Sequence, residues 1–82
     1  MNLVELTEFI VKELVSDPDS VSVKEFDSEN EDEIVIQVMV QEKDMGVVIG
    51  RGGKIASAIR TIVMASSYLK DKKHVKINID SY

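Results

Sequence analysis

The sequence predicts an α/β fold: an α+β two-layer sandwich in which helices pack on one face of a three-stranded sheet. Apolar residues recur at helical spacing in two segments, and three other segments are rich in alternating or β-branched residues. All four glycines fall between residues 46 and 53. Eighty-two residues are expected to form one domain, spanning 1–82.

The N-terminal half is expected to supply one helix and two strands. A helix over about 3–15 is indicated by an apolar stripe: Leu3, Leu6, Ile10 and Leu14. It should end in "SDPDS", because Pro18 disfavours helical geometry in the residue before it. "VSVKEF" alternates as a short strand does, and β-branched "IVIQVMV", residues 34–40, predicts a central strand. The acidic run between them reads as a solvated loop.

The C-terminal half is expected to supply two helices and the last strand. "EKDMGVVI" can hold one or two helical turns, with Asp44 as the N-cap. The longest helix, about 53–69, should carry one apolar stripe with two alanines beside it: Ile55, Ile59, Ile62 and Leu69, with Ala58 and Ala65. "KDKK" then turns the chain into the alternating strand "HVKINID". The predicted order is α-β-β-α-α-β.

Composition excludes several classes of protein. Cysteine is absent, so no disulfide framework or thiolate metal site is expected. The apolar N-terminus is interrupted by charged residues, which is unlike a secretory signal or a membrane span, and a cytoplasmic location without membrane contact is expected. The single histidine, His74, has no cysteine or serine–acid arrangement to complete a nucleophilic triad, so the chain is not expected to be an enzyme.

Charge is distributed unevenly along the chain. The formal net charge is −5, but residues 1–44 carry thirteen acids and three lysines, whereas residues 45–82 carry seven bases and two acids. Polyanion binding depends on local potential, so the basic half is a candidate surface for nucleic acid. The alternative is that a small domain is simply lopsided in charge.

The glycine cluster "GVVIGRGGKIASAIR" lies between the two predicted C-terminal helices. A helix end followed by a turn explains one or two glycines. It does not explain Arg51 within the turn or Lys54 opening the next helix, because a cation there opposes the helix dipole. Free N–H groups around Gly53, Lys54 and Ile55 would complete an anion site. The turn is therefore expected to hold phosphate.

Other binding motifs fit poorly. A Walker motif would need glycine at Val48 and Ser or Thr at Ile55, and a dinucleotide fingerprint would follow a strand. The acidic run 27–33 lacks the central glycine of a calcium loop. None of the four aromatic residues lies in the glycine segment, which argues against an RRM or OB-type stacking platform. No metal or other cofactor is expected.

The segment "VVIGRGGKI" resembles the signature of KH domains, with Gly50, Arg51, Gly52 and Gly53 as the G-x-x-G loop between two helices. The element order resembles the type II KH fold. Together with the chain length and N-terminal helix, "EKDMGVVIGRGGKIASAIRTIV" resembles the small bacterial KhpA family. The resemblance implies a single KH domain, with an N-terminal helix and strand in 1–27 and the core motif in 34–79.

The resemblance implies that the glycine loop clamps about four nucleotides of single-stranded RNA. An apolar groove would receive the bases, with "KDKK" as its opposite wall. Lys54 is the expected first-turn phosphate contact and Arg60 a secondary one; weaker candidates are Lys70, Lys72 and Lys73. Because the second variable position is Gly52, the loop carries only one charged side chain, and tight binding by one domain is not expected.

The resemblance also implies partners and a cellular role. Such proteins pair with themselves or with a Jag-type KH protein, and act as RNA chaperones linked to cell division, elongation and cell shape. Because a footprint of about four nucleotides allows few contacts and two linked sites raise avidity, a homodimer, or a heterodimer with another KH protein, formed away from Arg51 and Lys54 is expected. The alternative is a protein-interaction module in which the KH-like fold serves mainly dimerisation.

Overall fold

The computed structural model describes residues 2–70 and 72–82, with the predicted order of helices and strands. Three short 3₁₀ turns (Pro18–Ser20, Glu42–Asp44 and Arg51–Gly53) join the main elements. Those elements are α1 (Leu3–Leu14), β1 (Ser22–Asp27), β2 (Glu33–Val40), α2 (Met45–Ile49), α3 (Lys54–Lys70) and β3 (His74–Ser81). The "KDKK" turn includes residue 71, which lies outside the described residues.

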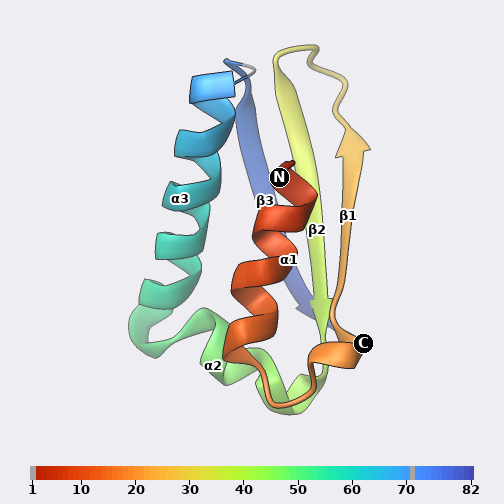
Figure 1. The fold of residues 1–82 in the computed structure, drawn as a ribbon, viewed down its shortest axis with the longest axis vertical. Helices are drawn as coiled ribbons and strands as arrows, with labels where there is room; N and C mark the ends of the chain where they lie inside the picture. Colours follow the sequence, from red (N-terminus) through yellow and green to blue (C-terminus); the bar gives the residue numbers. More distant parts are fainter. Residues whose placement is uncertain (1, 71) are drawn as a thin grey trace.

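The three strands form one sheet in the order β1-β2-β3, so the predicted central strand is central. β1 pairs antiparallel with β2, and β3 pairs parallel with it. The three helices cover one face of this sheet, as expected, and no helix or strand among residues 2–70 and 72–82 covers the other face (Figure 1). β3 is an edge strand, with α3 beside it on the helical side.

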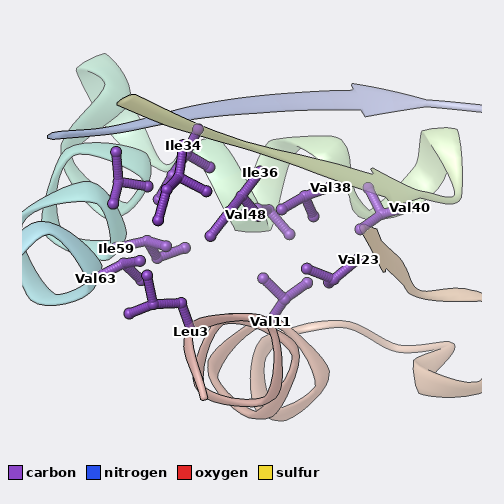
Figure 2. Close-up of a cluster of buried hydrophobic side chains, with 12 residues drawn as sticks. Leu3, Val11, Val23, Ile34, Ile36, Val38, Val40, Val48, Ile59 and Val63 are labelled. Atoms are coloured by element: carbon purple, nitrogen blue, oxygen red, sulfur yellow. The ribbon is translucent and has the colours of Figure 1, made fainter. Parts of the chain in front are cut away.

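The core lies between the sheet and the helices (Figure 2). Every second residue of β2 is buried there: Ile34, Ile36, Val38 and Val40. Each helix adds at least one fully or almost fully buried side chain: Val11, Val48, Ile59 and Val63. β2 therefore turns its uniformly β-branched side toward the helices and turns Glu33, Val35, Gln37 and Met39 toward the other face.

The predicted apolar stripe of the long helix is wrong in part. Ile59 is buried and Ile55 packs against the core, but Ile62 is 48% exposed and Leu69 is 87% exposed. The buried residues of α3 are instead Ala56, Ile59, Val63 and Ser67. These four residues recur at 3-4-4 spacing and define one face of the helix, and Ile62 and Leu69 lie off that face.

Asp44 precedes α2 as predicted, but its side chain does not cap that helix. Its carboxylate instead accepts hydrogen bonds from the Ser16 amide (3.0 Å), the Ser16 hydroxyl (2.7 Å) and the Asp17 amide (3.3 Å). These bonds, led by the Ser16 amide, hold the pKa of Asp44 below its usual value. The chain leaving α1 exposes these amides beside Asp44, so the carboxylate joins the end of α1 to the start of α2.

Candidate nucleic-acid interface

Gly50 makes the sharp turn between α2 and α3. Its φ is 77°, and a Cβ built on it would lie 2.6 Å from Cγ1 of Ile55. Any other residue would therefore meet both backbone strain and a clash with a side chain that packs on the core. This glycine is required by the fold.

Gly52 and Gly53 have a different environment. Both have positive φ, of 65° and 78°, but a Cβ added to either would meet no atom within 4 Å. Packing therefore does not require glycine at these positions, although backbone conformation favours it. Open space above two successive glycines lets a ligand approach the main chain closely.

The free backbone donors of the turn differ from those predicted. The Gly53 amide donates to the Gly50 carbonyl at 3.1 Å, and the Lys54 amide donates to the Arg51 carbonyl. The 3₁₀ turn runs directly into α3, so it provides acceptors for these two amides, which an abrupt helix start would leave unpaired. Among the described residues, the amides of Arg51 and Gly52 have no recorded acceptor within the protein and are the donors left for an anion.

No carboxylate of the described residues forms an ion pair with the two cations of the turn. Arg51 and Lys54 are both exposed, and the one ion pair recorded among residues 2–70 and 72–82 joins Lys12 to Glu8 on α1. Arg51 lies beside the free amides, and Lys54 begins α3. The turn thus presents two positive charges and two amide donors to the same solvent region.

Arg60 connects α3 to the edge of the sheet. Its Nε donates a long hydrogen bond, 3.4 Å, to the carbonyl of Ile77 in β3. Helical spacing places Met64, which is exposed, next to Arg60 on the same side of α3. We call this surface the α3–β3 seam: Arg60 and Met64 of α3 with Ile77 and Ile79 of β3.

The backbone of β3 presents alternate residues to this seam. The amide of His74 at its start and that of Tyr82 just beyond its end both donate toward the β2 side, to Asp32 and Val40. Peptide groups alternate in direction along a strand, so those of Val75, Ile77 and Ile79 point to the free edge. Of these, the Ile77 carbonyl is already bonded to Arg60. The edge near Ile79 thus offers unpaired main-chain donors and acceptors.

The lysines of the "KDKK" segment are not near the glycine turn. Lys70 is the last residue of α3, and Lys72 and Lys73 come shortly after it, so the 17 residues of the helix separate these lysines from the turn by about 25 Å. Lys73 lines a pocket of about 640 Å³ at the β1–β2 connection, together with several carboxylates: Glu25, Asp27, Glu31, Asp32 and Glu33. That acidic pocket is unsuited to phosphate, so the structure does not bring Lys73 together with Arg51 and Lys54.

Two further expectations concern metals and membranes. Among residues 2–70 and 72–82, no three His, Asp or Glu side chains are grouped as ligands for a metal ion. Within the same part of the chain, no helix has the length and apolar character needed to cross a membrane.

The family model for the KH domain of KhpA/KhpB matches residues 4–79. The chain belongs to this family. The match includes the glycine turn, both flanking helices and all three strands except the last residues of β3. The predicted type II KH fold and family resemblance are therefore confirmed.

Curated members of the family are similar over nearly their whole length. The RNA-binding protein KhpA of Caldanaerobacter subterraneus subsp. tengcongensis is 47% identical, over 92% of this chain and 96% of the relative. The RNA-binding protein KhpA of Borreliella burgdorferi is 40% identical, over 95% of this chain and 92% of the relative. These KhpA relatives are named as binding proteins and not as enzymes, which agrees with the expectation of a non-catalytic chain.

Solved structures share the fold of this KhpA/KhpB-family chain. Era in complex with MgGDPNP and nucleotides 1506–1542 of 16S ribosomal RNA superposes with a TM-score of 0.68 at 19% identity. A point variant of Aquifex aeolicus Era bound to GDP·AlF4⁻ gives 0.71 at 19% identity. The match covers 96–98% of this chain but only 29–30% of each Era chain, so one portion of Era has the same fold.

Proposed function

We propose that the protein binds single-stranded RNA, with the sugar-phosphate backbone on the glycine turn and the bases along the α3–β3 seam. The observation that carries this proposal is the open space above Gly52 and Gly53, beside two exposed cations that form no ion pair with the residues that the structure describes. The naming of the KhpA relatives as RNA-binding proteins supports RNA as the polyanion.

The turn supplies the phosphate contacts. A phosphodiester over Gly52 can accept hydrogen bonds from the free amides of Arg51 and Gly52. Arg51 and Lys54 then add charge within the screening length of about 8 Å at physiological salt. These contacts are the same for every sequence, so they fix the position of the strand and carry no base preference.

Base contacts are available on both sides of the turn. Val47 and Ile49 of α2 are exposed directly before it and offer apolar surface. Across the seam, the free edge of β3 near Ile79 offers main-chain groups to the polar edges of unpaired bases. Such groups are accessible only to splayed, unstacked bases, so single strands fit the seam and duplexes do not.

Fluorescence anisotropy with a labelled oligouridine and a duplex DNA of equal length tests this proposal. Stronger binding to the single strand is expected, together with competition by unlabelled single-stranded RNA. Equal binding to both nucleic acids would contradict a role for the seam in holding bases. Crosslinking in cells followed by RNA sequencing would then identify the bound transcripts.

We further propose that the protein works as a dimer, because a footprint of about four nucleotides selects RNA targets poorly. The exposed side of α3 carries a suitable stripe at 4-3-4 spacing: Ala58, Ile62, Ala65 and Leu69. This spacing is that of helices packing against each other. Ile62 and Leu69 lie about 12 and 22 Å along the helix from Lys54, so pairing there leaves the glycine turn free.

Light scattering after size-exclusion chromatography tests the dimer. The double variant Ile62→Lys, Leu69→Lys should have half the mass of the parent protein, because charged side chains in the stripe oppose pairing of the two α3 helices. Both replaced side chains are exposed, so the core stays intact. Met64→Lys is the matched control, since this exposed residue lies on the seam side of α3. A parent protein that is monomeric alone but co-elutes with a Jag-type KH protein would point to the heterodimer.

The family resemblance supports the finer parts of the proposal. Residues 1–82 would act as one KH domain in the cytoplasm, as an RNA chaperone linked to cell division and elongation. A strain that lacks its own copy provides the test: the wild-type gene should restore normal cell length, and an RNA-binding-deficient gene should not. Full restoration by the deficient gene would favour the alternative of a module that serves mainly protein interaction.

A further inference from the structure

In the described part of the chain, no helix or strand covers the face of the sheet opposite the helices (Figure 1). Its middle is formed by two rows of paired residues: Phe26–Val35–Lys76 and Lys24–Gln37–Asn78. Parallel strands are usually covered on both faces, yet the β2–β3 pair here is covered on one. The open face of the sheet is therefore a candidate binding surface.

The residues in the middle of the open face match the chemistry of single-stranded nucleic acid. Phe26 is 51% exposed and pairs with half-buried Val35, so it offers aromatic surface to a base on this face. Lys24 and Lys76 are exposed, and neither forms an ion pair among the described residues. Acidic side chains on this face lie at its ends, where Asp80 pairs with Met39 and Glu33 with His74.

The open face adjoins the seam across a single strand. Ile77, which accepts the hydrogen bond from Arg60, directly follows Lys76 in β3. Successive side chains of a strand point to opposite faces, so Lys76 lies on the open face at the level of the seam. A strand of RNA that leaves the seam over the edge of β3 reaches Lys76 first and Phe26 two strands further on.

We propose that the open face is a second contact surface for the same single-stranded RNA, with Phe26 stacking on a base and Lys24 and Lys76 contacting phosphates. This inference rests on the proposed function of the glycine turn and extends its footprint beyond about four nucleotides. A protein partner fits this face less well, because charged and amide side chains occupy most of its middle, and interface cores are depleted of charge.

The test compares a 5-mer and a 12-mer of oligouridine by fluorescence anisotropy. Phe26→Ala should weaken binding of the 12-mer by at least about fivefold, the lower end for loss of one stacked base, and leave the 5-mer unchanged. Lys24→Ala with Lys76→Ala should reduce the salt slope of the 12-mer by about 1.4, from about 0.7 per phosphate. A 5-iodouridine 12-mer should photocrosslink to the peptide that contains Phe26.

Matched controls separate this effect from general surface changes. Phe9 on α1 is 56% exposed, so Phe9→Ala removes a ring of equal size and similar exposure from the helical side. Lys12→Ala with Lys43→Ala removes two lysines from outside the open face. Both controls should bind the 5-mer and the 12-mer as the parent protein does.

Each outcome decides one of the two proposals. Parent-like binding of the 12-mer by Phe26→Ala, with the 5-mer still bound, would overturn the second surface and leave the glycine turn in place. Failure of the parent protein to bind either oligomer would contradict the proposed function itself. A changed mass of Phe26→Ala in light scattering, with RNA binding unchanged, would overturn the inference in favour of a protein partner.

Discussion

Placing two carboxylates in the glycine turn should strongly weaken RNA binding without unfolding the protein. The variant is Arg51→Asp with Gly52→Asp, and its matched control is Arg51→Asn with Gly52→Asn. Gly52 has φ 65° and ψ 18°, a left-handed conformation that Asp and Asn tolerate better than other side chains. A Cβ there meets no atom within 4 Å, so neither variant creates a clash.

The expected magnitudes follow from charge. A unit charge at about 4 Å from a phosphate contributes about 1 kcal/mol in bulk water and about 4 kcal/mol near a protein surface. The aspartate variant changes the local charge by three units, so affinity should fall by about a hundredfold or more. The asparagine control loses one charge and should weaken binding by about fivefold. Each variant places one non-glycine residue at the left-handed position, which costs about 1 kcal/mol of folding free energy. In a domain of this size, that cost lowers the melting temperature by about 4–8 °C.

Anisotropy with an oligouridine 12-mer gives the affinities, and circular dichroism during heating gives the melting temperatures. The aspartate variant should melt within a few degrees of its asparagine control but bind RNA at least about tenfold more weakly. If the folded aspartate variant bound RNA as tightly as the parent protein, the reasoning about the glycine turn would be refuted.

Three other measurements test separate parts of the account. If three or four phosphates are bound, log K against log salt should slope at about −2 to −3, and Lys54→Ala should flatten it by less than one unit; a slope near zero would favour the protein-interaction alternative. Gly50→Ala should lower the melting temperature by at least about 8 °C because its Cβ would clash with Ile55, whereas Gly46→Ala, with open space at a helical position, should raise or maintain it. Asp44 has a pKa lowered in the folded state, so its carboxylate stabilises the fold above the ordinary value of 3.8, and this contribution is lost as the pH falls through the folded pKa. The melting temperatures of Asp44→Asn and the parent should therefore converge on acidification below that value; a gap that stays constant between pH 7 and pH 2 would contradict this role of the Asp44 charge.

The sequence was sufficient to predict the order of elements, because the two periodicities of 3.6 and 2 are clear in the short segments. The β-branched run in residues 34–40 predicts a central strand, and the structure places this strand in the middle of the sheet. The glycines from Gly50 to Gly53 predict the turn between the two helices, because glycine adopts the positive φ angles found there. The G-x-x-G motif of this turn, set between two helices, was also enough to indicate the KH family.

The sequence could not predict which side of the long helix is buried. α3 has apolar residues around much of its circumference, so the choice between Ile62 and Val63 depends on packing with elements far away in sequence. The bond from Arg60 to the Ile77 carbonyl and the bonds from Ser16 to Asp44 likewise join distant segments. No local pattern encodes them. The free amides of the turn depend on whether α3 begins abruptly or through a 3₁₀ turn, which the glycines leave open.

Amide chemical-shift mapping by NMR tests the central claim most directly, because it reports every backbone position of this small protein at once. Titration with an oligouridine 5-mer should shift the amides of Gly50 to Lys54, Arg60 and Ile79, and leave those of α1 unchanged. Shifts confined to α1 or to the stripe at Ile62 and Leu69, with the glycine turn unaffected, would contradict the claim that the turn and the α3–β3 seam hold RNA.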